Sequence, residues 1–464
     1  MDSLPPELIQ EVALYLPPRD IINCSLVCKH WSEALNIDKI WKRVTCQVFG
    51  VDCSKDWSRK HLPKSISAEF CKWRRLFLVN CQLCRNWRKW PMKDSIDRET
   101  GVLDLSFINL SFNDEDLIIL YSKEKHLDYV MYIWNINGEQ PVLYQKISGG
   151  LIDEVVVSFF QLNHHTLIIL QEAIFHVFKK GSDSMYRLST RFIINLNIQF
   201  DHISEWVSLI GKHKIRSVAS YCNENYFIAS SVKDKQEQSI FIYNFDKDCS
   251  TSLLGFEDSE LCGLFWTKAY IKRNGSNPLL ICIDLSTLKT KFTLPYSKYK
   301  DIHCKHKYII FIDPDIDVLE LWDSFNGTFV KCLPYQGQIM NFTSSGEFFY
   351  TVCRNDLGEV RVYDENNNQV SCLRVSYGFI SFSFLWSRFA VVRGVIQSTG
   401  YQPFYSYFEL WDFGALVAKK MHTVRDTSLK LFINKSKTKA VVVKFKAGCD
   451  IECIEIVNFL SNFN

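Results

Sequence analysis

The sequence lacks any long apolar run, any strong excess of charge and any apolar leader with a cleavage site. No stretch approaches the ~18 apolar residues that a membrane-spanning helix needs, and charged residues appear within the first ten positions. With 54 basic and 51 acidic residues among 464, the chain lacks the basic footprint typical of nucleic-acid binders. We therefore expect a protein of the cytoplasm, the nucleus or both that binds neither membrane nor nucleic acid. Its 17 cysteines are then expected to be reduced thiols.

Motifs for catalysis are also missing from the sequence. It contains no Gly-rich phosphate loop, no G-x-S-x-G elbow and no nucleophile with a nearby base. Cys81-x-x-Cys84 is half of a zinc motif without a second pair of ligands. His303, Cys304 and His306 cluster in sequence, but neighbouring side chains of a strand point to opposite faces. We therefore expect no metal, no cofactor and no catalytic residue, and thus a non-enzymatic protein.

What the sequence does contain begins with a helix near the N-terminus. Ser3 is expected to cap this helix, Glu7 lies near its positive end, and Pro17-Pro18 stops it. Three apolar residues recur at intervals of four and form one stripe: Leu8, Val12 and Leu16. So short a segment cannot bury this apolar surface alone, and we expect it to need a partner.

A second and a third helix are expected to follow within residues 20–45. Asp20 caps the second, Asn36 closes it, and Asp38 opens a short third helix that contains Trp41. Apolar residues recur along the second helix at three- and four-residue spacing: Ile21, Cys24, Val27, Cys28 and Trp31. We expect Trp41 to belong to the module's own core.

The ordered set of these residues resembles the F-box family. It reads Leu4-Pro5-x-Glu7-Leu8, then Leu16, Asp20-Ile21, Val27-Cys28-Lys29, Trp31 and Trp41. The resemblance implies that the segment binds the Skp adaptor of an SCF-type (Skp–cullin–F-box) ubiquitin ligase, and helix-in-groove recognition would use the apolar stripe. The implied adaptor-binding residues are Leu4, Pro5, Glu7, Leu8, Val12, Leu16, Ile21, Val27, Cys28 and Trp31. The alternative is a helical bundle that buries the same stripe against the rest of the chain.

Residues 69–93 have helical periodicity and a basic character. Seven Lys and Arg residues lie between Lys72 and Lys93, with no acidic residue among them. A basic helix can bind nucleic acid or membrane, but a linker helix with a solvated charged face explains it better. Arg85-Asn86-Trp87-Arg88 resembles the Asn-Trp-Arg element that closes the linker helices of F-box/WD-repeat proteins.

From about residue 95, short runs rich in Ile, Val, Phe and Tyr alternate with turn-forming residues, which predicts antiparallel strands. A repeated mark ends such runs at Trp134-Asn135, Tyr243-Asn244, Ile283-Asp284, Trp322-Asp323, Tyr363-Asp364, Trp411-Asp412 and Val457-Asn458. The run Ile174–Phe178 fits the same rhythm without the polar partner. The period of ~40–45 residues predicts a β-propeller of four-stranded blades.

Eight marks predict seven or eight blades, with an insertion or an irregular blade in residues 179–239. Trp322-Asp323 and Trp411-Asp412 resemble the signature dipeptide of WD repeats. The Gly-His element of that family is missing, so we expect its hydrogen-bonded tetrads to be absent in most blades. The alternative is a tandem of β-sandwiches, which fits the even spacing less well.

Basic residues recur in the predicted hairpins between the second and third strands of the blades. They are Lys123 and Lys125, Lys233 and Lys235, Lys272 and Arg273, Arg354, and Arg393. Cations at the mouth of a central channel would suit an acidic or phosphorylated target peptide. Solvent-exposed hairpin tips are often charged in any case, and Asp313, Asp315 and Asp317 argue against a uniformly basic face.

The sequence thus predicts an α+β multidomain protein with an F-box at residues 1–48, a helical linker at 49–94 and a seven- or eight-bladed WD-like propeller at 95–464. We expect a non-catalytic substrate receptor of an SCF-type ubiquitin ligase, which binds the Skp adaptor, through it a cullin, and an unknown target. Targets would be ubiquitinated and degraded by the proteasome. The alternative function is a scaffold that joins partners without directing degradation.

Overall fold

The structure of the chain is a computed structural model of residues 1–464. It describes two N-terminal stretches, 4–49 and 69–88, and a series of strands with many of their turns. These lie at 95–96, 107–113, 115–122, 129–137, 141–148, 157–163, 165–171, 174–193, 198–199, 216–233, 237–256, 259–275, 277–296, 301–305, 307–313, 317–335, 337–345, 348–354, 359–364, 366–374, 379–384, 389–396, 405–412, 419–426, 429–434, 438–445 and 451–459.

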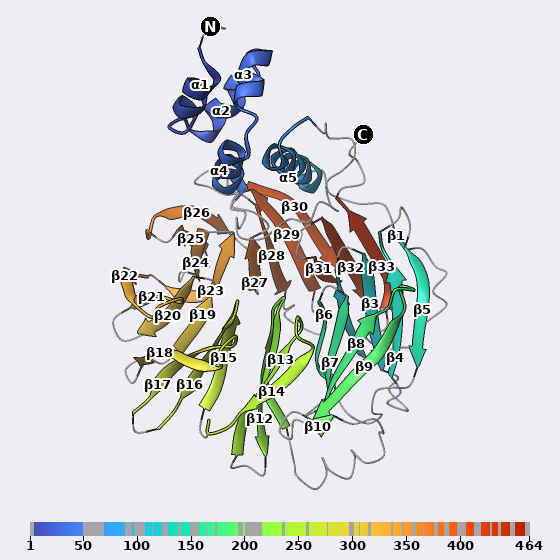
Figure 1. The fold of residues 1–464 in the computed structure, drawn as a ribbon. Helices are drawn as coiled ribbons and strands as arrows, with labels where there is room; N and C mark the ends of the chain where they lie inside the picture. The colour runs from blue at the N-terminus through green and yellow to red at the C-terminus, as the bar shows by residue number, and fades with distance from the viewer. Residues whose placement is uncertain are drawn as a thin grey trace. The chain divides into compact units, whose positions relative to one another are not determined.

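Five helices precede the strands (Figure 1): α1 (Pro6–Ala13), α2 (Pro18–Cys24), α3 (Lys29–Ala34), α4 (Asp38–Phe49) and α5 (Lys72–Arg88). Prolines at the first positions of α1 and α2 suit helix starts, because their missing N–H would have no partner there. Glu7 and Asp20 lie in the first turns, near the positive ends of the helix dipoles.

The helix starts differ from our expectations in three ways. Pro5 and Pro17 occupy the N-cap positions, so Asp20 is not a cap, and Ser3 lies outside the described residues. The second helix is two helices, because Cys28 is fully extended at the start of α3. The helix from Asp38 is not short: it continues through twelve residues to Phe49.

Within the described ranges the strands form eight sheets, and every strand pairing whose register the structure gives is antiparallel. The first five contain β2 (Phe107–Phe112), β3 (Asp116–Ser122), β4 (Tyr129–Asn135), β5 (Val142–Ser148); β6 (Val157–Asn163), β7 (Thr166–Gln171), β8 (Ile174–Lys180), β9 (Tyr186–Ile193), β10 (Ile198–Gln199); β11 (Arg216–Cys222), β12 (Tyr226–Lys233), β13 (Glu237–Asn244), β14 (Cys249–Leu253); β15 (Ser259–Phe265), β16 (Lys268–Arg273), β17 (Leu279–Asp284), β18 (Lys289–Pro295); β19 (Asp301–Lys305), β20 (Tyr308–Asp313), β21 (Val318–Asp323), β22 (Phe329–Pro334).

The last three sheets contain β23 (Gln338–Ser345), β24 (Phe348–Arg354), β25 (Glu359–Asp364), β26 (Gln369–Arg374); β27 (Phe379–Phe384), β28 (Phe389–Ile396), β29 (Tyr405–Asp412), β30 (Lys419–Asp426); and β31 (Leu429–Ile433), β32 (Lys439–Phe445), β33 (Ile451–Asn458) with β1 (Ser95–Ile96). Seven sheets are thus built from consecutive strands, and the eighth takes β1 from upstream of the first. N-terminal helices followed by a bladed β-propeller confirm the predicted fold class.

The predicted repeat marks coincide with one structural position. Every polar mark ends the third strand of its sheet, from Asn135 in β4 to Asn458 in β33, and Ile174–Phe178 lies in the third strand β8. The long interval after residue 179 contains the extra strand β10. In two marks the indole of Trp322 or Trp411 donates a hydrogen bond to Glu320 or Glu409, two residues earlier on the same strand.

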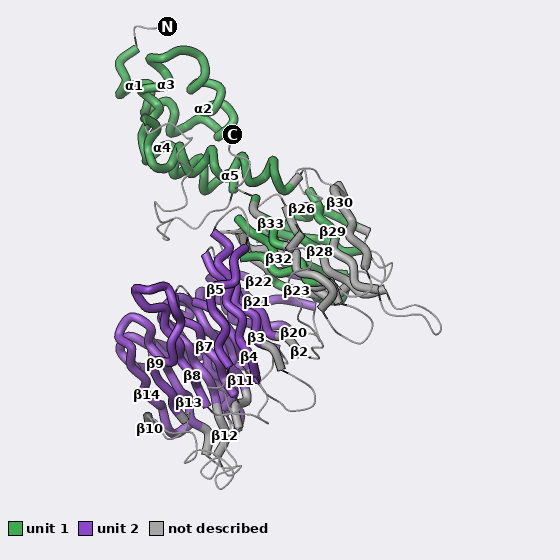
Figure 2. The backbone as a smooth tube through the Cα atoms, turned by 90° about the vertical axis from the view of Figure 1, so that its right-hand side faces the viewer, with its two compact units in different colours: residues 1–95, 336–444, 455–464 green, residues 96–335, 445–454 purple. Residues whose placement is uncertain are grey.

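The sheets bury their faces against their neighbours in sequence. One core cluster joins β2–β5 to β6–β10, and three more join each sheet to the next as far as β19–β22. The chain divides into two compact units (Figure 2): residues 1–95, 336–444 and 455–464, and residues 96–335 and 445–454. The predicted boundary at 94 falls between α5 and β1, and the one at 48 falls in the last turn of α4; the predicted division into three domains stays a prediction.

Two findings bear on the predicted environment. Within the described ranges, no helix is long and apolar enough to span a membrane. Cys46 is disulfide-bonded, so our expectation of reduced thiols is wrong at this position. Thirteen other cysteines whose side chains the structure describes form no disulfide.

Candidate functional site

The N-terminal helix α1 buries one face and exposes the other. Ile9 and Ala13 are each 1% exposed, whereas Leu8 is 52% and Val12 51% exposed. Tyr15 continues the exposed side one turn further. Single exposed apolar residues are common on protein surfaces, but several in a row on one side of a helix form a patch. Such a patch indicates a protein-binding surface. We call Leu8 and Val12, together with Tyr15 in the turn just after the helix, the apolar face of α1.

Long-range hydrogen bonds hold α1 in place. Arg43 of α4 donates to the carbonyl oxygens of Ala13 (2.8 Å), Leu14 and Leu16 (2.6 Å), at the end of α1. Ala13 ends α1 and Leu14 is its C-cap, where helix carbonyls lack α-helical N–H partners, and a cation also suits the negative end of the helix dipole. His30 Nε2 donates to the Leu4 carbonyl over 2.9 Å. Sequence reasoning missed Arg43, which lies 29 residues from Leu14 and has no local motif.

The predicted adaptor-binding residues divide between surface and core. Leu4, Pro5, Glu7, Leu8, Val12 and Val27 are exposed, and Leu16, Cys28 and Trp31 are half-buried. Ile21 must be corrected, because it is fully buried in the core of the helices and has no surface to offer a partner. Trp41 is buried as expected, and its indole donates to the Leu35 carbonyl over 2.8 Å.

The basic helix α5 is a structural linker. Its Arg74 is buried, stacks its guanidinium over the rings of Trp41 and Phe70, and donates to the Ser32 carbonyl. Burial lowers the pKa of Arg74, which is the cost of placing a cation in the core. On the opposite side, Leu83 and other apolar residues of α5 join the same core cluster as α4. This supports the linker interpretation over nucleic-acid or membrane binding.

The end of α5 is attached to the last sheet. Trp87 is fully buried and stacks on Phe459 with ring centroids 3.7 Å apart, and Asn86 Nδ2 donates to the Phe459 carbonyl over 2.6 Å. One core cluster contains Ile9 of α1, Trp87 of α5 and Val457 of β33. The Asn-Trp element that resembled the linker of F-box/WD-repeat proteins therefore does join the helices to a blade.

The structure places the predicted target-binding cations at strand ends, where it describes them. Lys233, Arg273 and Arg354 are the last residues of β12, β16 and β24, next to the hairpins in which they were expected. Arg393 instead lies inside β28, opposite Ser381 and Phe408. Lys123, Lys125 and Lys235 lie outside the described residues. The cationic target site stays a prediction.

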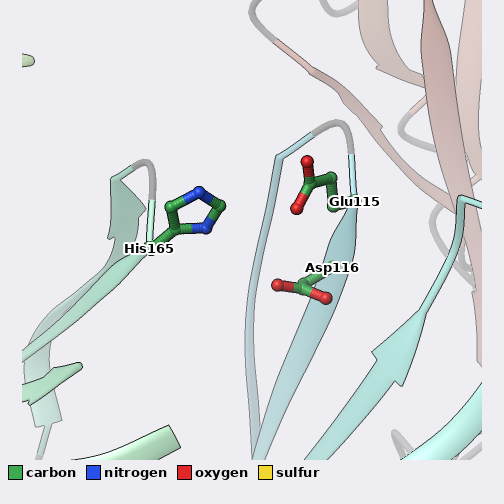
Figure 3. A group of neighbouring side chains, drawn as sticks. All are labelled: Glu115, Asp116 and His165. Carbon is green, nitrogen blue, oxygen red and sulfur yellow. The ribbon is translucent and has the colours of Figure 1, made fainter. Parts of the chain in front are cut away.

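One group of side chains has the composition of a metal site (Figure 3): Glu115, Asp116 and His165. The two carboxylates come from the start of β3, and His165 comes from the turn before β7. Lys180 already donates to Asp116 over 2.7 Å, as does the Tyr186 hydroxyl over 2.9 Å. A cation would have to displace the Lys180 ammonium, so we assign this group as a buried ion pair.

The other metal candidates are structural as well. Cys84 is buried in the helical core and Cys81 is exposed. His303 and Cys304 are neighbours on β19, which turns their side chains to opposite faces. His306 lies outside the described residues.

Comparison with known proteins agrees with this geometry. Residues 1–47 match the family model described as F-box-like. The chain thus consists of an F-box-like domain followed by a β-propeller, and it fits the F-box/WD-repeat type. No curated protein matches the chain.

Solved structures give distant likenesses. Sqt1 from Saccharomyces cerevisiae is 7% identical, with a TM-score of 0.48 over 77% of this chain and 98% of that one. The computationally designed Ika8 protein is 10% identical, with a TM-score of 0.47 over 79% of this chain and 100% of that one. Hsv2 from Kluyveromyces lactis is 9% identical, with a TM-score of 0.40 over 70% and 99%. None of these likenesses carries information on function.

Proposed function

We propose that this chain is a substrate-receptor subunit of an SCF-type ubiquitin ligase. The F-box-like region binds a Skp-type adaptor, and through it a cullin, while the propeller binds a target protein. The observation that carries the proposal is the apolar face of α1, in a segment that the F-box-like family model matches. An amphipathic helix that presents such a face suits an apolar groove on a partner.

The attachment of α5 supports a receptor role. A continuous core runs from α1 through α4 and α5 to β33, so the helices pack against the last sheet. A ligase needs such a connection, because ubiquitin transfer by other subunits depends on holding the target at a fixed distance. The chain itself is proposed to be non-catalytic, with ubiquitin transfer supplied by those subunits.

The direct test is capture of a purified Skp-type adaptor by the full chain. Leu8→Glu and Pro5→Gly are each expected to reduce capture by about a hundredfold, because hot-spot residues supply most of the binding energy. Leu254→Glu changes a 77% exposed apolar residue far along the sequence and should leave capture unchanged. Capture that survives both N-terminal changes would contradict the proposal.

A second experiment separates the ligase receptor from the scaffold. Partners of the intact chain are compared with partners of Leu8→Glu in cells by quantitative proteomics. A point variant is preferable to deletion, because residues 9–41 share a core with α5. Targets of a ligase should accumulate on Leu8→Glu and gain stability. Adaptor binding with no partner that changes in abundance would favour the scaffold.

A further inference from the structure

Two turns of the sheet β15–β18 carry large apolar residues where a fold normally places glycine or a polar residue. Trp266, between β15 and β16, has φ of 54°, and Leu288, between β17 and β18, has φ of 57°. This left-handed conformation suits Gly and Asn and disfavours bulky side chains. Both residues are exposed, Trp266 by 43% and Leu288 by 41%.

The other blades show what this position ordinarily holds. The turns between the third and fourth strands have their left-handed residue at Ser184, Asp248, Gly327 and Asn367. Between the first and second strands, Asn113 and Asn223 begin the turn and Asn163 ends the first strand, and none of the three has a positive φ. Only the β15–β18 turns, among those described, put large apolar groups at both places.

A third aromatic residue completes the surface from the neighbouring sheet. Phe325 lies between β21 and β22, is 39% exposed, and makes an edge contact with Trp266 at a centroid distance of 5.9 Å. All three turns lie at the same ends of adjacent sheets, because turns one and three of an antiparallel four-stranded sheet share an end. We call Trp266, Leu288 and Phe325 the turn patch.

Side chains from neighbouring strands and turns hydrogen-bond to the backbone of two of the patch turns. Asn223 Nδ2 donates to the Trp266 carbonyl over 2.6 Å, and Lys268 Nζ donates to the Phe325 carbonyl over 2.9 Å. Tyr270 donates to the Ser324 carbonyl next to it over 2.7 Å. Aromatic groups that are fixed before binding lose little entropy on binding, which favours affinity.

The charge around the turn patch indicates the kind of partner. Lys289 directly follows Leu288 and Lys291 lies two residues further along β18; both are exposed and form no ion pair within the described ranges. Two carboxylates lie nearby: Asp284 accepts from the Ser286 amide and interacts electrostatically with Lys291, and Asp323 accepts from the Phe325 amide. The surface thus offers apolar contact beside the exposed ammonium groups of Lys289 and Lys291.

We propose that the turn patch docks a short peptide segment of another protein, in which a bulky apolar side chain is flanked by carboxylates. This deepens the proposed function by assigning the target-binding surface to the turn end of β15–β22. It lies at the opposite end of β16 from Arg273, which ends that strand at the hairpin to β17. The apolar side chain contacts Trp266 and Phe325, and the carboxylates pair with Lys289 and Lys291.

The test uses the full chain and a phage-displayed library of random twelve-residue peptides. Enriched peptides are expected to combine an apolar residue with neighbouring Asp or Glu. Affinities of the synthesised peptides are then measured on variants. Trp266→Gly and Phe325→Ala should each weaken binding by about tenfold or more, and Lys289→Glu with Lys291→Glu by a similar factor that shrinks at high salt.

Controls separate lost binding from lost folding. Glycine suits the backbone at position 266, so Trp266→Gly should keep the melting temperature within a few degrees. Val142→Ala, in an exposed apolar residue at the start of β5, should not alter peptide affinity. Adaptor capture should be unchanged in every turn-patch variant, so a failed adaptor assay with intact peptide binding contradicts only the proposed function.

Three outcomes would overturn the inference. Enriched peptides that bind Trp266→Gly and Phe325→Ala as well as the native chain would place the binding surface elsewhere. A library with no enriched sequence would remove the docking role. Self-association of the chain that is lost in Trp266→Gly would make the turn patch an interface between copies.

Discussion

Large apolar side chains reach the surface in two regions of this chain, and they do so on different backbones. In α1 the exposed residues Leu8 and Val12 follow the period of a helix whose other face is buried. In the turn patch, Trp266 and Leu288 both have a left-handed backbone, and at the position of Leu288 other described blades have Ser184, Asp248, Gly327 or Asn367. An interaction surface on a helix can therefore be predicted from the spacing of apolar residues in the sequence. One built from turns becomes visible only when equivalent blades are superimposed.

The largest effect on stability is expected at Ile9 of α1, and its exposed neighbour Leu8 serves as the comparison. Ile9→Ala should lower the free energy of unfolding of the helical region by about 2–5 kcal/mol, because it leaves a cavity in the core. Leu8→Ala should cost less than about 0.5 kcal/mol, since Leu8 is exposed. Hydrogen exchange of the α1–α4 amides in the full chain measures both. Equal effects would show that the exposed side of α1 is covered.

A pH change is expected to act on the sheets through His176. Burial, with a smaller contribution from Arg191, lowers the pKa of His176 to about 3, and both ring nitrogens lack hydrogen-bond partners. The unfolded chain takes up this proton near pH 6.5 and the folded one does not. The free energy of unfolding is therefore unaffected by His176 above pH 6.5. It decreases as the pH falls, by about 3 kcal/mol at pH 4.5.

Urea unfolding at pH 7.5 and 4.5 checks this expectation. His176→Leu should shrink the difference between the two pH values, because it removes the titrating group. An unchanged difference would assign the acid sensitivity to other residues.

A smaller effect on stability is expected at Arg43, through which α4 contacts the end of α1. Arg43→Met removes the hydrogen bonds to the last carbonyls of α1 and should cost about 1–2 kcal/mol. Adaptor affinity should fall by about tenfold, because the apolar face then loses its fixed orientation. Lys39→Met, in an exposed residue of the same helix, is the matched control. Calorimetric titration with the adaptor distinguishes them, and equal affinities would contradict a positioning role for Arg43.

The smallest effect has the opposite sign. Leu288→Gly should stabilise the chain by about 0.5 kcal/mol or leave it unchanged, because glycine adopts φ of 57° without strain. Gly327→Ala should destabilise it, since φ is 71° there and an added Cβ would lie 2.5 Å from the Phe292 ring. Thermal denaturation compares the two. A destabilised Leu288→Gly would mean that Leu288 is retained for folding and not for binding.

The sequence was sufficient where the relevant pattern is local. The ends of the third strands, the helix over residues 72–88 and the exposed Leu8 and Val12 all follow from spacing or composition. Ile21 was misassigned because a family pattern does not separate core from surface positions. The eighth sheet could not be predicted, since it pairs β1 with β33, more than 350 residues away.

Contacts between distant residues account for the rest. Arg43 reaches α1 from another helix, and Asn86 reaches Phe459 across 373 positions. In the sequence, Trp266 does not differ from other apolar residues near strand ends. Only the structure shows its left-handed backbone. In each case the chemistry depends on a three-dimensional neighbour that no local pattern encodes.

Hydrogen exchange of the full chain, with and without a purified Skp-type adaptor, tests the central claim most directly. The adaptor should slow exchange in residues 6–27, which contain the apolar face of α1, and leave the turns at 266–267 and 324–328 unchanged. Slowed exchange in the sheets with none in α1 would contradict the account.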